Sequence, residues 1–156
     1  MAEAFYSIVL DHSAERVWSI IRPFDHYAWA GVRSTTTIEH GKSGDQVGAV
    51  RRVELPDRTI RQVLRAHSDL ERFYTYAFDG PPPQPVRDYV ATLRVTPVVE
   101  SGQSFVEWRA KFDCLDAAET DKWIEHFETQ GFAVWLAALR DFMKAQNVRS
   151  YAASSV

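Results

Sequence analysis

The chain has 156 residues, of which 46% are hydrophobic and 13% aromatic, so it can bury the core of a single domain. Its 18 Lys and Arg residues against 21 Asp and Glu residues give a net charge of −3, and no basic run stands out, which argues against a nucleic-acid partner. The first residues lack the basic and apolar regions of an export signal, and no apolar stretch is long enough to span a membrane, so we expect neither export nor a membrane span.

The N-terminal part of the chain predicts one strand followed by two short helices. Residues 4–10 are rich in β-branched and aromatic types, which suit a strand. Ser13 precedes an apolar series at helical spacing and can cap its first turn, and Pro23 ends that helix. Residues 24–32 predict a second short helix whose aromatic side chains pack inward.

The middle of the chain predicts an antiparallel meander. Turn residues rich in Gly, Pro, Ser and Asp separate six stretches of β character. The expected strands are residues 33–40, 47–54, 59–67, 71–79, 86–97 and 104–114. Short links between consecutive strands are typical of antiparallel pairing. In the last strand Trp108 alternates in phase with other apolar residues, so we expect it to face the core.

The C-terminal part predicts one long amphipathic helix. Residues 117–146 contain no proline, and apolar residues including Phe127, Gly131 and Trp135 fall on one stripe. A helix of about 30 residues spans about 45 Å, which is enough to cross a whole sheet. The sheet is therefore the expected partner of the apolar stripe.

Gly131 and the aromatic residues together favour an internal cavity. Glycine costs about 1 kcal/mol relative to alanine inside a helix. Gly131 either makes room for a ligand or a helix bend, or packs closely on Trp108 or Trp135, and the sequence leaves both readings open. A single helix covering one layer of sheet rich in large aromatics favours a hollow, and such hollows bind small molecules. We expect Tyr89, Trp108 and Phe127 to face it.

Three local strings carry a resemblance to a known superfamily: SAERVWSIIRPFDHYAWA, GPPPQPVRDYVATLRVTP and FVEWRAKF. With the order of elements, they resemble the START-like and polyketide-cyclase superfamily (SRPBCC, Bet v 1-like) over residues 3–146. The resemblance implies an α+β helix-grip fold. In this fold a curved seven-stranded antiparallel sheet wraps around a long C-terminal helix, and two short helices follow the first strand. The domain then comprises residues 1–146, with a short, disordered tail at 147–156.

The resemblance also implies an entrance formed by the loops 55–58 and 80–87. The residues expected there are Leu55, Pro56, Pro83 and Pro85. These loops correspond to the gate and latch of the plant abscisic-acid receptors, which belong to the same superfamily. The gate in this chain is shorter and lacks the Ser-Gly lead-in of the receptors, so a hormone-receptor function is not implied.

Two arginines match ligand-site positions of those receptors. Arg33 corresponds to a ligand-anchoring lysine at the start of strand two, and Arg61 to a pocket-lining position on strand four. Because an arginine can hold a carboxylate with two hydrogen bonds, we expect an acidic end of the ligand to meet Arg33, with Arg61 or Tyr89 assisting. Alternatively, both arginines are surface residues. Glu128 either points to the cavity rim, or lies in water or pairs with a strand arginine.

No motif predicts a metal, a cofactor or a catalytic nucleophile. The five histidines are scattered without metal-ligand spacing, and the sequence contains no G-x-S-x-G, P-loop or G-x-G-x-x-G string. Cys114 is the only cysteine, which excludes an intramolecular disulfide. A cytoplasmic location is expected on this basis.

The superfamily places binding proteins, lipid carriers, cyclases and hydroxylase subunits on one scaffold, so the resemblance leaves the function open. We prefer binding or carriage of an aromatic, polyketide-like or lipid-like molecule, because this needs only apolar walls and one or two polar anchors. The alternative is a polyketide cyclase or dehydratase that uses acid–base groups such as Tyr89, Glu128 or a histidine. A third reading is a structural or interaction protein whose own aromatics fill the hollow. The sequence leaves a homodimer open.

Overall fold

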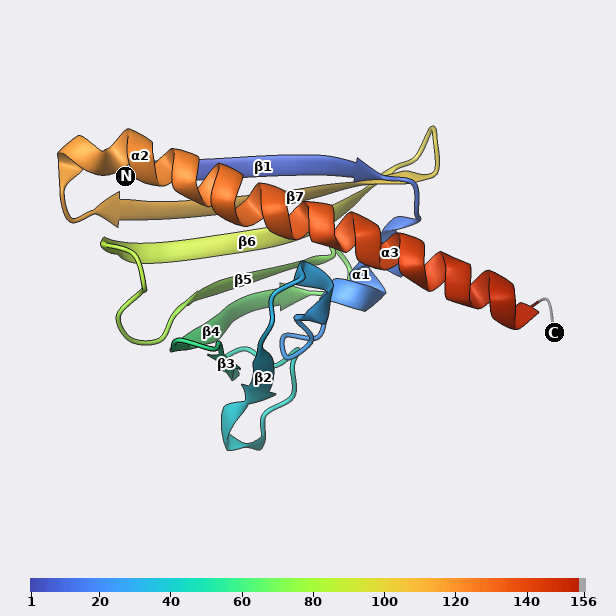
Figure 1. The fold of residues 1–156 in the computed structure, drawn as a ribbon, viewed down its shortest axis with the longest axis horizontal. Coiled ribbons are helices and arrows are strands. Elements are labelled where there is room, and N and C mark those ends of the chain that lie inside the picture. The colour runs from blue at the N-terminus through green and yellow to red at the C-terminus, as the bar shows by residue number, and fades with distance from the viewer. Residues whose placement is uncertain (155–156) are drawn as a thin grey trace.

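The protein forms one antiparallel sheet crossed by a long helix, and the computed structural model describes residues 1–154, with side chains through residue 147 (Figure 1). The sheet has seven strands in the order β1-β7-β6-β5-β4-β3-β2. The strands are β1 (Ala2–Leu10), β2 (Thr35–Ile38), β3 (Val50–Glu54), β4 (Thr59–Ser68), β5 (Phe73–Phe78), β6 (Val86–Val98) and β7 (Gln103–Cys114). All neighbouring pairs are antiparallel, which confirms the predicted meander and helix-grip fold.

The segment after β1 begins as predicted and then departs from the prediction. Helix α1 (Ala14–Ile21) is capped by Ser13, whose Oγ accepts a hydrogen bond from the Arg16 amide at 3.2 Å. The expected second helix is only the 3₁₀ turn η1 (Ala28–Ala30). It stops at Gly31, whose φ of 71° lies in the left-handed region and ends a right-handed turn.

The long C-terminal helix is composed of several segments. A 3₁₀ turn η3 (Ala117–Glu119) leads into α2 (Thr120–Glu125), the π-helical segment η4 (His126–Phe132) and α3 (Ala133–Ser154). The helix begins as predicted, but α3 runs past the predicted end of the domain at residue 146. Residues 155–156 lie outside the described residues, and disorder of the tail 147–156 stays a prediction.

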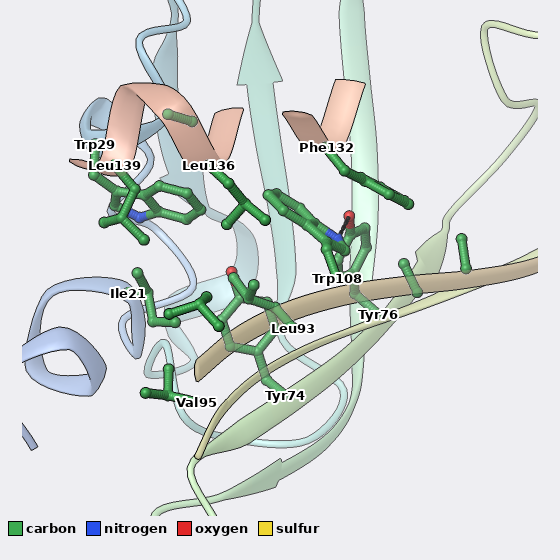
Figure 2. Packing of buried hydrophobic residues seen from close by; sticks show 14 of the residues in the cluster. Ile21, Trp29, Tyr74, Tyr76, Leu93, Val95, Trp108, Phe132, Leu136 and Leu139 are labelled. Carbon is green, nitrogen blue, oxygen red and sulfur yellow. Dashed lines mark hydrogen bonds between the residues drawn. The ribbon is translucent and has the colours of Figure 1, made fainter. Parts of the chain in front are cut away.

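The core lies between the inner face of the sheet and the long helix (Figure 2). Trp108 of β7 is completely buried, as its alternation predicted. Leu136 and Leu139 of α3 and Ile21 of α1 are completely buried in the same cluster. Among the residues that the structure describes, no helix is both long and apolar enough to cross a membrane.

Candidate ligand-binding cavity

A cavity of about 410 Å³ lies between the sheet, the long helix and the two predicted entrance loops. Its walls come from β3 to β6, from η4 and α3, and from the segment after η1. The apolar lining residues are Val32, Val53, Leu55, Pro56, Ile60, Phe78, Pro83, Phe127 and Trp135. The hollow is therefore not filled by the protein's own side chains.

Eight further lining residues carry polar groups. They are Tyr27, Arg33, Asp57, Arg58, Gln62, Tyr76, Gln84 and Tyr89. Burial raises the pKa of Tyr27, Tyr76 and Tyr89 above that of a free phenol, so the three hydroxyls stay protonated and can donate hydrogen bonds. The side-chain oxygen of Gln84 is buried without a partner among the described residues and can accept one.

Tyr89 enters the cavity at an irregularity of β6. The pairing register shifts between Arg87 and Val90, and Asp88 adopts a φ of 54°. Such a bulge bends a strand and redirects its side chains. The ring of Tyr89 lies 5.1 Å from that of Phe127, measured between centroids, so β6 and the long helix close the same end of the cavity.

Most of the predicted site residues meet at this cavity. Arg33, Tyr89, Phe127 and Trp135 all line it, although they come from three separate parts of the chain: the segment before β2, strand β6 and the long helix. The predicted entrance residues Leu55, Pro56 and Pro83 line it as well, whereas Pro85 is not among the lining residues.

Trp108 and Gly131 support the cavity from behind its lining. The Trp108 indole N–H donates to the Tyr76 hydroxyl at 3.1 Å (Figure 2). The centroid of the Trp108 ring lies 5.1 Å from that of Trp135. A Cβ on Gly131 would lie 3.4 Å from the Trp135 ring. Of the two readings of Gly131, close packing on a tryptophan is the one that the geometry favours.

Arg61 and Glu128 lie elsewhere, against expectation. Arg61 projects from the other face of β4, donates to Glu39 at 2.9 and 2.6 Å, and pairs with Asp79 at 3.0 Å. Because side chains alternate along a strand, its neighbour Gln62 occupies the inward position instead. The Glu128 carboxylate accepts a hydrogen bond from the Phe5 amide of edge strand β1 at 3.0 Å. Glu128 is not among the residues that line the cavity.

Arg51 of β3 is a feature that the sequence prediction missed. Its side chain is completely buried. Its Nε donates to Gln62 Oε1 at 2.7 Å, and its Nη1 donates to the Phe24 carbonyl at 3.2 Å. The guanidinium carbon lies 4.2, 4.7 and 5.0 Å from the ring centroids of Phe24, Tyr27 and Tyr76. The signal was present, because Arg51 alternates in phase with a buried valine of the same strand.

Metal chemistry finds no support in the side chains described. Within the described part of the chain, no group of three or more His, Cys, Asp or Glu residues is placed to hold a metal ion. Cys114 is a free, half-buried thiol at the end of β7.

Solved structures similar to this one are numerous. The protein XoxI from Bacillus cereus is 30% identical, with a TM-score of 0.77 over 90% of this chain and 94% of that chain. A protein from Thermobifida fusca, solved by solution NMR, is 29% identical, with a TM-score of 0.78 over 90% of this chain and 91% of that chain.

More distant similarity shows the fold alone. Norcoclaurine synthase from Thalictrum flavum, solved in complex with dopamine and hydroxybenzaldehyde, is 14% identical, with a TM-score of 0.69 over 92% of this chain and 86% of that chain. Comparison with curated proteins found no match. The family model described as polyketide cyclase / dehydrase and lipid transport matches residues 1–151, and with the helix-grip fold and its cavity this shows that the chain belongs to that family.

Proposed function

We propose that the protein binds a small, largely apolar molecule, about the size of one to three aromatic rings, in the cavity between the sheet and the long helix. The observation that carries the proposal is the cavity of about 410 Å³ with mostly apolar walls. Pockets for small molecules have volumes of about 300–1,000 Å³ and combine apolar walls with a few polar groups. Aromatic rings suit this lining, because six of the side chains that surround the space are themselves aromatic: Tyr27, Tyr76, Phe78, Tyr89, Phe127 and Trp135.

The comparisons support the size and character of the ligand. The family description includes lipid transport and polyketide chemistry, both of which involve molecules rich in carbon. Norcoclaurine synthase, which has the same fold, was solved with two single-ring aromatic compounds. These observations favour an aromatic or lipid-like ligand.

Binding is favoured over catalysis by the placement of the titratable groups. A cyclase or dehydratase needs an acid–base pair within the dry part of the cavity. Glu128, one candidate base, is engaged with β1, and the buried tyrosines remain protonated. Asp57, in the loop after β3, is the one carboxylate among the described lining residues. Binding requires none of these groups to titrate.

The proposal is tested with N-phenyl-1-naphthylamine, a neutral fluorescent probe with an apolar body. The wild-type protein should bind it with a dissociation constant in the micromolar range, about −8 kcal/mol. Ile60→Trp enlarges a lining side chain and should weaken binding about tenfold or more, because it occupies the ligand's space.

Thr59→Trp is the matched control, since Thr59 precedes Ile60 in β4 and is exposed. It should bind the probe as the wild type does. Absence of saturable binding by the wild type, or equal binding by the Ile60→Trp and Thr59→Trp variants, would refute the proposal.

A further inference from the structure

Arg51 carries a buried positive charge for which the described protein supplies no counter-charge. No exposed surface remains on the residue. None of the ion pairs within 4.0 Å among the described residues involves it. Its Nη2 is buried without a hydrogen-bond partner in the same part of the chain. A buried ion without a partner of opposite charge is strongly destabilising, so this arrangement calls for compensation.

The neighbours of Arg51 compensate only part of this cost. Three aromatic rings surround the guanidinium at 4.2–5.0 Å, where their negative faces attract a cation. The hydrogen bonds to Gln62 and to the Phe24 carbonyl engage neutral acceptors, and the Tyr74 hydroxyl, a third neutral group, also lies close to the guanidinium. The positive charge therefore remains, and it acts over a short distance in surroundings of low dielectric constant.

The charge lies directly behind one wall of the cavity. Tyr27, Gln62 and Tyr76 line the cavity on one side and contact Arg51 on the other. The side-chain oxygen of Gln62 accepts from Arg51, so the amide group that Gln62 has left for a ligand is its NH₂ donor.

The tyrosine hydroxyls of the same cavity wall are further hydrogen-bond donors. The Tyr76 oxygen already accepts from Trp108 at 3.1 Å, so Tyr76 donates its own proton either to a ligand or to the neighbouring Tyr89 hydroxyl, whose proton then remains for a ligand. Tyr27 adds a second phenol to this wall. Donors without matching acceptors, in front of an uncompensated cation, form a site for negative charge.

We propose that the ligand carries a carboxylate or a similarly planar, delocalised oxyanion, and that this group is held against the wall backed by Arg51 while the apolar part fills the rest of the cavity. The inference rests on the proposed binding function and names the class of ligand. The proposed position of the acidic group also differs from the one predicted from the sequence. That prediction placed the group at Arg33, which is exposed and lines the cavity from the segment before β2. The ligand then supplies the negative charge that compensates the positive charge of Arg51.

The experiment compares 2-naphthoate with 2-naphthamide as competitors that displace N-phenyl-1-naphthylamine. The two compounds share the ring system and differ in charge. The wild type should prefer the acid about tenfold or more. Arg51→Met should reduce this preference to less than about twofold, whereas Arg52→Met, an exposed neighbour on the other face of β3, should keep it.

A second variant leaves Arg51 in place and adds a negative charge beside it. Gln62→Glu places a carboxylate at the oxygen that already accepts from Arg51 at 2.7 Å. If the cation is uncompensated, this variant should raise the melting temperature of the ligand-free protein and remove the preference for naphthoate. This result remains available if Arg51→Met does not fold.

The outcomes separate the two proposals. If the neutral probe fails to bind the wild type, the binding function itself is wrong. If the probe binds but the wild type does not prefer naphthoate, or Arg51→Met keeps the preference, only the anion inference is overturned. A lower melting temperature of Gln62→Glu, or loss of the preference in Arg33→Met but not in Arg51→Met, would overturn it too.

Discussion

Asp69 illustrates how one carboxylate can join two elements of the fold. It accepts hydrogen bonds from the Trp18 indole at 2.9 Å and from two nitrogens of Arg22 at 2.9 Å each, and His67 Nε2 lies 3.0 Å away. The Arg22 guanidinium, assisted by Trp18 and His67, holds the pKa of the Asp69 carboxyl well below its usual range. These contacts tie α1 to the turn after β4.

Asp69→Asn is expected to lower the free energy of unfolding by about 1 kcal/mol at pH 7, because the amide cannot carry the negative charge. The value is modest because the carboxylate is 55% exposed, and solvent screens it. The pKa is depressed in the folded state, so the stabilisation is complete above the unfolded-state pKa of about 3.9 and is lost as the pH falls. Urea unfolding should therefore give a smaller difference between wild type and variant at pH 3 than at pH 7. An equal difference at both pH values would contradict this account.

Individual side chains were predictable where strand alternation governs them. The phases of β6 and β7 placed Tyr89 and Trp108 inward, and both are buried. Arg61 was placed in the cavity by an approximate family match, and the alternation of β4 puts Gln62 there instead. Hydrogen-bond partners such as the one Glu128 finds on β1 depend on tertiary distance, which no local pattern contains.

Between elements, Gly31 sets the approach of the η1 turn to α3. Its φ of 71° is a conformation that other residues rarely adopt, and a Cβ there would lie 3.1 Å from the Cβ of Ala138. The next two residues, Val32 and Arg33, line the cavity. The glycine therefore determines where this part of the wall lies.

Gly31→Ala should lower the free energy of unfolding by about 2 kcal/mol, of which about 1 kcal/mol reflects the left-handed backbone and the rest the close contact. Gly102→Ala is the matched control, because its φ is 75° and nothing lies within 4 Å of the added Cβ. The difference between the losses of unfolding free energy of the two variants, measured by urea unfolding, gives the contribution of the contact with Ala138. Equal losses would show that the approach to Ala138 does not constrain the fold.

The long helix was predicted, but its π-helical segment was not. The apolar stripe repeats over many residues, and one additional residue in a turn between positions 126 and 132 changes this average little. The local change still matters, because Phe127 lies within the segment and Trp135 follows it, and both line the cavity. The sequence thus predicted the helix that covers the sheet, but not the π-helical segment that sets the direction of its cavity-lining side chains.

For the molecule as a whole, the order of β2 to β7 follows from short links between consecutive strands, and the sequence predicted it. The pairing of β1 with β7 joins distant parts of the chain, and no local pattern of the sequence predicts it. The depth of the cavity and the burial of Arg51 depend on how side chains from several elements pack together. These properties cannot be read from any one segment.

NMR can show whether a ligand binds in the cavity between the sheet and the long helix. Isotope-filtered nuclear Overhauser spectra of the labelled protein with unlabelled N-phenyl-1-naphthylamine report which side chains contact the probe. We predict contacts from the probe to Ile60, Tyr89 and Phe127, three lining residues from β4, β6 and η4. Contacts confined to exposed apolar side chains such as Val9 and Val90 would contradict the account.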